Sequence, residues 1–302
     1  MQNSVSAFAV GKDGSLTEVP GSPFLTGGRA GDNLRPRAYA SNRIRVSNNL
    51  LYASNALSND VTGFVIDAET GSLTPVPGSP FATGGSSGFG MSLALTPDGR
   101  FLYAGHGGFG GSNNLRVFGI GPEGELATVG DLVPAGEGVN GMMVTPDGRW
   151  LAVALSLEGP HGALAMFGID PETGELALAK GSPFPFEWAV EPDGRPAGVD
   201  INCASDTLFV GEGSLFGTTS VHVLNLDPKT GALTPIKGSP FTPGVGENSN
   251  VVLLSPDGFL LFVSNQESNS VTVFSVEEGG TLNLIPGSPF PGGGAGACPR
   301  FS

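Results

Sequence analysis

The stretch Gly-Ser-Pro-Phe occurs five times in this chain of 302 residues, and its spacing decides the fold. The copies lie at Gly21–Phe24, Gly78–Phe81, Gly181–Phe184, Gly238–Phe241 and Gly287–Phe290. Neighbouring copies are separated by about fifty residues or by a multiple of that interval, and a fixed period of this size is typical of repeated supersecondary units. We therefore expect one repeat architecture rather than an irregular domain.

Each repeat contains four strand-like runs. The first ends in a Pro-Asp-Gly turn, as at Pro97–Gly99, and the second follows at once, as at Leu102–Ala104. The third run leads through a turn such as Asp170–Gly174 into a short fourth run. Proline and glycine supply the backbone angles that such turns require. Because the fourth run ends in proline, which cannot donate to a sheet, we expect it at an outer edge.

Four antiparallel strands per repeat, the last at an edge, predict an all-β fold, a β-propeller, rather than an open solenoid. We expect residues 1–302 to form a single β-propeller domain of about six blades. The terminal blade is incomplete, since the chain begins at a third run and stops where a first run starts. The ring either closes imperfectly or belongs to a longer chain, as part of a seven-bladed ring.

Two further expectations concern the repeated stretch itself. Each of its Phe residues should pack between neighbouring blades, because the chain passes there from one blade to the next. The third repeat carries Asp131–Ala135 in place of the stretch. We expect that repeat to form the most irregular blade.

The amino-acid composition limits which kinds of molecule the protein can bind. The net charge is −14, which repels nucleic acid and anionic membrane surfaces, and no apolar run is long enough to span a membrane. The N-terminal residues Met1–Phe8 lack the basic start and apolar core of a signal peptide. Cys203 and Cys298 allow one disulfide at most, and we expect two unpaired thiols in a monomer. The compartment stays open: cytoplasmic, or exported if the N-terminus is truncated.

Several motifs recur along the chain: Pro-Asp-Gly-Arg-Phe-Leu-Tyr-Ala at Pro97–Ala104, and Ser-Asn-x-x-Ser-Asn-x-Val at Ser54–Val61 and Ser264–Val271. They resemble the motifs of the lactonase-type propellers, the group of 6-phosphogluconolactonase and carboxymuconate cyclase, and of the related YVTN repeats. The resemblance covers nearly the whole chain. It is specific for the fold, whereas propellers of this kind host many functions.

The resemblance implies a channel-facing His five residues before the proline of the first turn, and a Glu after an Asn at the end of the second strand. The His positions are occupied here by Ser92, Gly141, Gly198, Val251 and, in the cut terminal repeat, Phe301. The Glu positions are occupied by Ala56, Gly107, Gly213 and Gln266. Only Arg300 matches an arginine-bearing pattern of the family. Opening a lactone ring needs a proton donor or base within reach, so these departures argue against that activity.

Other residues remain as candidates for a site. His106 and Glu212 are the candidate acid/base groups, although single buried or solvated residues of these types are more often structural. Trp188 could stack on a sugar ring or simply pack. Five of the ten arginines lie between Arg29 and Arg45, and Arg35, Arg37, Arg43 and Arg45 are the candidate anion ligands together with Arg300. Their guanidinium groups suit carboxylates and phosphates, or else they neutralise acidic neighbouring blades.

These observations favour a binding or scaffold module whose variable loop face engages a protein, a glycan or a small anion. The alternative is a lactonase that hydrolyses an anionic sugar lactone, and a third class is a structural module of a surface array. No His/Cys/Asp spacing matches a metal site, and we expect no cofactor.

Overall fold

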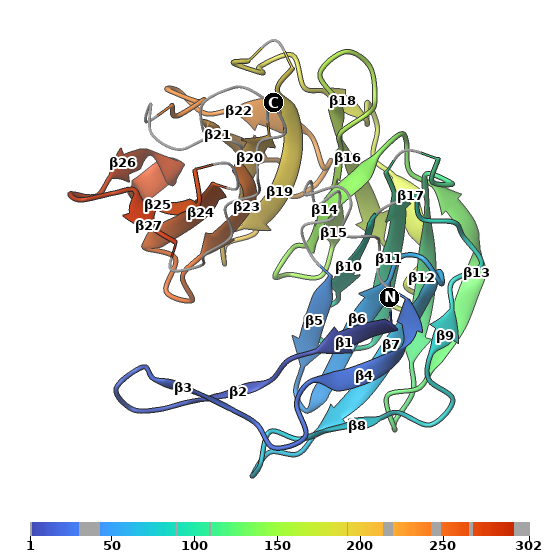
Figure 1. Ribbon diagram of the computed structural model, residues 1–302. Helices are drawn as coiled ribbons and strands as arrows, with labels where there is room; N and C mark the ends of the chain where they lie inside the picture. The colour runs from blue at the N-terminus through green and yellow to red at the C-terminus, as the bar shows by residue number, and fades with distance from the viewer. Residues whose placement is uncertain are drawn as a thin grey trace, which may run out of the picture.

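A computed structural model describes residues 2–29, 43–88, 90–108, 110–191, 193–213, 220–242, 249–265 and 268–292. The strands of these residues are grouped into sheets that stand side by side around a common centre (Figure 1). One short 3-10 helix, η1 (Glu278–Gly280), interrupts them. The expected all-β propeller is confirmed.

The strands form six groups in chain order, which we call blades 1 to 6. Blade 1 contains β1 (Gln2–Val5), β2 (Phe8–Val10), β3 (Leu16–Glu18) and β4 (Phe24–Arg29). Blade 2 contains β5 (Ile44–Ser47), β6 (Leu50–Asn55), β7 (Asp60–Ile66), β8 (Leu73–Pro75) and β9 (Phe81–Ala82). Blade 3 contains β10 (Gly90–Leu95), β11 (Phe101–Gly107), β12 (Asn114–Ile120) and β13 (Leu126–Pro134).

The remaining strands follow the same order. Blade 4 contains β14 (Val139–Val144), β15 (Trp150–Leu155), β16 (Ala163–Ile169), β17 (Leu176–Leu178) and β18 (Phe184–Pro185). Blade 5 contains β19 (Arg195–Ile201), β20 (Thr207–Gly213), β21 (Ser220–Leu226) and β22 (Leu233–Pro235). Blade 6 contains β23 (Ser249–Leu254), β24 (Leu260–Asn265), β25 (Ser270–Val276), β26 (Leu282–Leu284) and β27 (Phe290–Pro291).

Blades 2 to 6 are antiparallel sheets in which four strands pair in sequence order. Their first strands lie innermost and contact one another from blade to blade. Blade 1 differs, because its described strands form two separate pairs, β1 with β4 and β2 with β3. It therefore presents only the outer half of a blade.

The serine of the Gly-Ser-Pro-Phe stretch explains why the stretch is repeated. In blade 2 the Ser79 hydroxyl accepts a hydrogen bond from the backbone N–H of Gly63 at 2.9 Å, and Ser182 does the same for Met166 in blade 4 at 2.9 Å. The equivalent pairs elsewhere are Ser22 with Ala7, Ser239 with Val223 and Ser288 with Val273. The serine hydroxyl thus accepts the hydrogen bond that a backbone carbonyl of the outer strand would accept if that strand continued without interruption.

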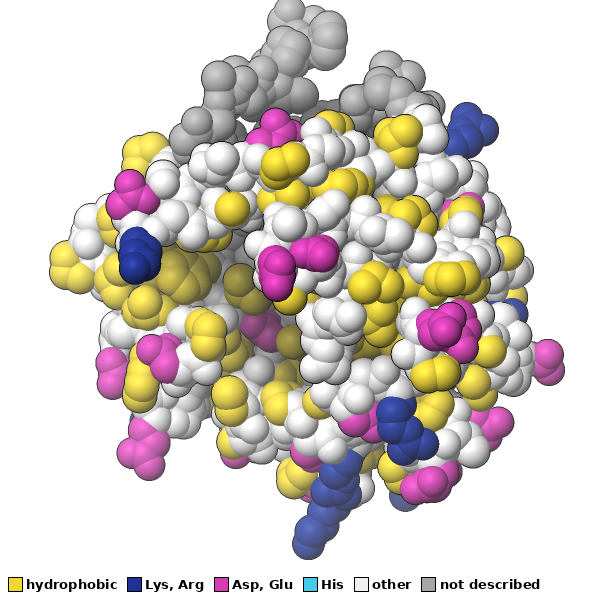
Figure 2. Space-filling model, turned by 90° about the horizontal axis from the view of Figure 1, so that it is seen from below, with side chains coloured by type: hydrophobic (Ala, Val, Ile, Leu, Met, Phe, Trp, Pro, Cys, Tyr) yellow, Lys and Arg dark blue, Asp and Glu magenta, His cyan; other side chains and the backbone are white. Residues whose placement is uncertain are grey.

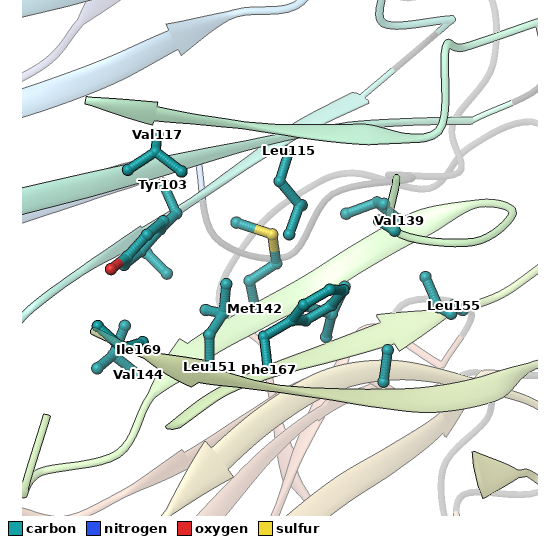
Figure 3. Close-up of a cluster of buried hydrophobic side chains, with 14 of the residues drawn as sticks. Tyr103, Leu115, Val117, Val139, Met142, Val144, Leu151, Leu155, Phe167 and Ile169 are labelled. Atoms are coloured by element: carbon teal, nitrogen blue, oxygen red, sulfur yellow. The ribbon is translucent and has the colours of Figure 1, made fainter. Parts of the chain in front are cut away.

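The cores of the molecule lie between blades. The largest cluster joins Tyr103, Leu115 and Val117 of blade 3 to Met142 and Phe167 of blade 4 (Figure 3). Four of the five Phe residues of the repeated stretch each pack against such a cluster, as predicted. These residues are Phe24, Phe81, Phe184 and Phe241. The fifth, Phe290, is 42% exposed.

The third blade is irregular at the place that the sequence predicts, although blade 1, whose strands form two separate pairs, departs further from the regular pattern. Its fourth strand, β13, is one continuous strand of nine residues with a single register shift opposite Leu115–Val117. In blades 2, 4 and 6 the outer edge is instead divided into two short strands by the Gly-Ser-Pro segment. In blade 3, which lacks the Gly-Ser-Pro segment, β13 stays one strand, and its register shift leaves Gly130, Asp131 and Leu132 opposite the single residue Arg116.

Candidate functional site

The first strands of the blades carry residues at equivalent positions around the centre of the ring, and we call each such position a level. One level is defined by the residue that stands opposite the second residue of the second strand's apolar run. In the strand register this is Arg45, opposite Tyr52, in blade 2 and Asp200, opposite Phe209, in blade 5. Met143 occupies this level in blade 4. Because side chains alternate along a strand, Arg43 lies on the same side of β5 as Arg45, one level away.

Arg45 reaches from blade 2 to blade 4. Its Nη2 donates to the backbone carbonyl of Met142 at 3.1 Å and lies 3.7 Å from the Sδ atom of Met143. Removal from water lowers the pKa of Arg45 to about 10, and the negative charge of Asp200 opposes that change. The guanidinium group remains positively charged at neutral pH.

Asp200 supplies the nearby negative charge. Its side chain is buried and accepts hydrogen bonds from the backbone N–H groups of Leu254 at 2.7 Å and Ile201 at 2.9 Å. Burial raises the pKa of this carboxyl group, whereas the two hydrogen bonds and the charge of Arg45 act in the opposite direction. Arg45 thus connects blades 2 and 4, Asp200 connects blades 5 and 6, and the two opposite charges attract each other.

Arg43 lines a cavity of about 170 Å³ between blade 1 and blade 2. The other lining residues are Asn3, Ser4, Val5, Ile44, Ala53, Ser54, Ala56 and Met91. Partial desolvation lowers the pKa of Arg43. The cavity thus combines one guanidinium group with the hydroxyl of Ser4, which are groups that bind carboxylates and phosphates, whereas Asn3 and Ser54 already donate to protein acceptors.

Arg43 occupies the level at which the family resemblance places a histidine in other repeats. The Ser54 N–H donates to the carbonyl of Arg43, as Ser264 pairs with Val251 in blade 6. In blade 3 this level holds Ser92, whose hydroxyl donates to the carbonyl of Asn140. At Gly141 of blade 4 an added side chain would collide with the carbonyl of Ala197. The inner strands approach too closely there for an imidazole group.

His106 is enclosed within its blade. Its Nε2 lies 2.7 Å from the Thr83 hydroxyl, and its Nδ1 lies 3.1 Å from the carbonyl of Asn114. The side chain is fully buried, and this burial lowers its pKa. Its bonds join the link that contains Thr83 to the third strand of blade 3. The catalytic role predicted for His106 stays a prediction, and its enclosure argues for a structural role.

Glu212 is buried in the same way in blade 5. Its Oε2 lies 2.7 Å from Nε2 of His222, and its carboxylate accepts hydrogen bonds from the backbone N–H groups of Val190 and Glu191. Neither side chain of the Glu212–His222 pair is exposed. The carboxylate holds the link that precedes blade 5, so its predicted acid/base role also stays a prediction.

His106 and Glu212 occupy one repeated structural position, the fifth residue of the second strand's apolar run. The equivalent residues are Asn55, Leu155 and Asn265. Asn55 accepts a hydrogen bond from Thr26 and donates to Thr62, and Asn265 donates to Thr272. Polar residues at this position tie the second strand to the third strand or to the preceding link.

The other predicted ligands fall into two groups. Trp188 is half-buried, packs against the core between blades 4 and 5, and meets the Phe186 ring edge-on at a centroid distance of 6.1 Å. Arg35, Arg37 and Arg300 lie outside the described residues. Of the predicted arginines, the structure therefore places Arg43 and Arg45 near the centre, and neither His106 nor Glu212 opens onto the cavity at Arg43.

Sequence reasoning missed the parts of this centre that come from distant blades. The contact of Arg45 with Met142 joins residues 97 positions apart, and no local motif marks it. Asp200 is not among the candidate residues that the sequence provides. Its alignment with Arg45 emerges when the inner strands are compared in register.

In the described part of the chain, no helix is long and apolar enough to cross a membrane. Within the same residues, no group of three or more His, Cys, Asp and Glu side chains could hold a metal ion.

Comparison with known proteins agrees with the fold. The periplasmic gluconolactonase PpgL of Pseudomonas aeruginosa is 21% identical with a TM-score of 0.66, over 82% of this chain and 69% of that one. A protein from Lactobacillus plantarum is 18% identical with a TM-score of 0.66, over 94% and 77%. A protein from Bacteroides uniformis, assigned provisionally as a 6-phosphogluconolactonase, is 14% identical with a TM-score of 0.68, over 94% and 77%. At these identities the likeness shows the shared fold.

The curated proteins gave no match. The family model described as lactonase, seven-bladed β-propeller, matches residues 89–187 and 217–296, which is more than half of the chain. The repeated blades, their inner strands and this match lead to one conclusion: the chain belongs to the seven-bladed lactonase propeller family.

Proposed function

We propose that this lactonase-family propeller binds a small organic anion at Arg43 and does not hydrolyse a lactone. One contrast carries the proposal. The candidate acid/base groups, His106 and Glu212, are sealed inside their blades, whereas Arg43 lines a cavity. A cavity of about 170 Å³ is smaller than sites for drug-sized ligands, roughly 300–1,000 Å³, and suits a carboxylate or phosphate group on a short stem.

Arg43 would hold the anion by charge-assisted hydrogen bonds, with Ser4 as an additional donor beside it. Arg45 has a different role in this proposal. Its contact with Met142 and the charge of Asp200 compensate it, so it braces the inner strands and adds positive potential.

Calorimetric titration with gluconate and with 6-phosphogluconate tests the binding role. We expect binding that Arg43→Gln weakens about tenfold or more, since the charge-assisted bonds are lost. Arg29→Gln is the matched control, because Arg29 is exposed at the end of β4. Equal affinities of the wild type and Arg43→Gln would contradict the proposed site.

The alternative function, hydrolysis of an anionic sugar lactone, is suggested by the names of the gluconolactonase and the provisionally assigned 6-phosphogluconolactonase above. It requires an acid or base within reach of the bound ring. The same purified protein tests it by lactone consumption.

A further inference from the structure

Blade 5 meets blade 6 differently from the way in which blades 2 to 4 meet the blades that follow them. In blades 2 to 5 the second strand begins with a side chain that lies against the third-to-fourth turn of the following blade. In the strand register these first residues are Leu50, Phe101, Trp150 and Thr207. A side chain added at the last glycine of each following turn would meet them, and these glycines are Gly124, Gly174, Gly231 and Gly280. Thr207 is the smallest of the four side chains, so it fills the least space.

Side-chain hydrogen bonds to the following turn close the earlier interfaces. In each case a hydroxyl or indole N–H of the second strand donates to a backbone carbonyl in the third-to-fourth turn of the next blade. The pairs are Tyr52 with Gly124 at 2.9 Å, Tyr103 with Gly174 at 3.1 Å and Trp150 with Pro228 at 3.1 Å. The turns of blades 3, 4 and 5 therefore each receive a donor from the preceding blade.

Blade 5 has different residues at these donor positions. The residue in register with Tyr52 and Tyr103 is Phe209, which has no hydroxyl group. The hydroxyl of Thr207 donates to Asp206 at 2.9 Å, within its own turn. Across the residues that the structure describes, no side chain of blade 5 donates to the turn of blade 6, residues 277–281. That turn therefore lacks the donor that the turns of blades 3 to 5 have.

A cavity of about 710 Å³ lies at this place, between blades 5 and 6. We call it the blade 5–6 cavity. Its volume is within the range of ligand sites, roughly 300–1,000 Å³. Thr207, Phe209 and Leu226 of blade 5 line it together with Phe259 and Val276 of blade 6. Because a threonine stands where blades 2 to 4 have a larger side chain, this interface keeps a space that the chain itself does not fill.

The polar part of the lining is acidic. The carboxylates of Asp206, Asp257, Glu277 and Glu278 line the cavity, and its lining contains no Lys or Arg. Within the described part of the chain, none of these four carboxylates forms an ion pair with a Lys or Arg side chain. Figure 2 shows more Asp and Glu side chains than Lys and Arg side chains on one face of the molecule, in keeping with the net charge of −14. Both the cavity and the surrounding field therefore favour a cation.

Blade 3 shows which kind of cation such a turn accepts. The two terminal nitrogens of Arg100 donate to the carbonyls of Pro171 and Glu172, in the turn of blade 4, at 3.0 and 3.3 Å. The Cζ atom of Arg100 lies 5.2 Å from the centre of the Phe101 ring. A guanidinium group thus combines donation to turn carbonyls with contact to an aromatic ring. In blade 5 the residue in register with Arg100 is Asp206, so the positive charge is replaced by a negative one.

We propose that the blade 5–6 cavity binds the side chain of an arginine residue of another polypeptide. The guanidinium group donates to the carbonyls of the blade 6 turn and pairs with the carboxylates of Asp206, Glu277 and Glu278, while the apolar stem lies on the aromatic lining. An arginine within a peptide suits the site better than free arginine, because the acidic lining repels the carboxylate of the free amino acid. The site is separate from the cavity at Arg43 and does not depend on the function proposed above.

Calorimetric titration with Nα-acetyl-arginine amide tests the proposal. We expect binding that is weakened about tenfold or more in the variant Glu277→Gln/Glu278→Gln, because two of the charged acceptors are lost. The matched control is Glu172→Gln/Glu175→Gln, which makes the same change in net charge at exposed positions of the corresponding turn of blade 4. The citrulline compound, which has nearly the same shape and no charge, should also bind about tenfold or more weakly. Far-ultraviolet circular dichroism establishes that the variants fold.

Filling the cavity from within the chain gives a second test. Thr207→Trp introduces the side chain that blade 4 has at this position, so it should abolish binding of the arginine compound and leave the protein folded. Arg43→Gln should bind the compound as the wild type does, which separates this site from the cavity at Arg43. A wild type that does not bind the compound would overturn the proposal. So would equal affinity for the citrulline compound, equal weakening by the control variant, or tighter binding of free arginine than of the amide.

Discussion

Arg45 and Met142 join the second and fourth blades across the centre of the ring, with 3.1 Å between the guanidinium Nη2 and the backbone carbonyl oxygen. This contact bypasses blade 3, whose residue at the level of Arg45 is Ala94. A small side chain in one blade thus leaves room for a long one from its neighbour. At the centre of the ring, the long side chain of one blade thus fills the space that the short side chain of the next blade leaves.

Replacing Arg45 by Met should lower the free energy of unfolding by about 1–3 kcal/mol, because the Met142 carbonyl loses a charged donor. The loss should be smaller in an Asp200→Asn background, since the two charges interact. Urea denaturation of the single and double variants measures this coupling. Arg149→Met, at an exposed turn position, is the control. Additive losses would show that Arg45 and Asp200 are independent.

Glu212→Ala should destabilise the protein by about 3–5 kcal/mol, because it leaves a buried histidine and two backbone N–H groups without their acceptor. Thermal and urea unfolding measure the effect, and Glu187→Ala, at an exposed position, should change little. A stable Glu212→Ala protein would argue that the carboxylate is not a structural clamp.

The pH dependence of stability should report on His106. Burial lowers the pKa of His106 in the folded protein, so the unfolded chain binds its proton more tightly. Its contribution is fully present above the unfolded pKa of about 6.5 and is lost as pH falls through the folded value. His106→Asn, which introduces the residue found at Asn55 and Asn265, should remove this part of the dependence. Identical unfolding profiles of wild type and variant between neutral and mildly acidic pH would contradict the assignment.

Ser79→Ala tests the repeated stretch. The backbone N–H of Gly63 would lose its hydroxyl acceptor, at a cost of about 1–3 kcal/mol. Thr74→Ala on the neighbouring outer strand is exposed and provides the matched control in the same denaturation experiment. If the Ser79→Ala and Thr74→Ala proteins are equally stable, the hydrogen bond of the serine hydroxyl does not explain why the Gly-Ser-Pro-Phe stretch is repeated.

The sequence predicts the fold because the information is local. Turn residues and apolar runs recur at each repeat, and strands of one blade are neighbours in the chain, so Pro97–Gly99 and Asp170–Gly174 mark turns without any knowledge of the ring. The serine hydroxyl of Gly-Ser-Pro-Phe could not be assigned in this way, because its partner is chosen by the register of the outer strand. The missing stretch at Asp131–Ala135 marks the register shift of β13, but it does not reveal the larger irregularity of blade 1.

The site is less predictable because it depends on contacts between blades. The arginine cluster includes Arg43 and Arg45, whose charges stand out in an acidic chain, and their role as anion ligands stays a prediction. The sequence makes His106 and Glu212 candidates for an acid/base role, but it does not reveal that both side chains are buried. Only the register of the second strands shows that these two residues replace Asn55 and Asn265 in a structural position.

The most direct test of the proposed function is the rate at which 6-phosphogluconolactone and glucono-1,5-lactone are consumed with and without the purified protein. We predict the spontaneous rate in both cases, together with binding of the corresponding acid that depends on Arg43. A rate well above the spontaneous one would contradict this account, above all if His106→Asn abolished it while the variant remained folded.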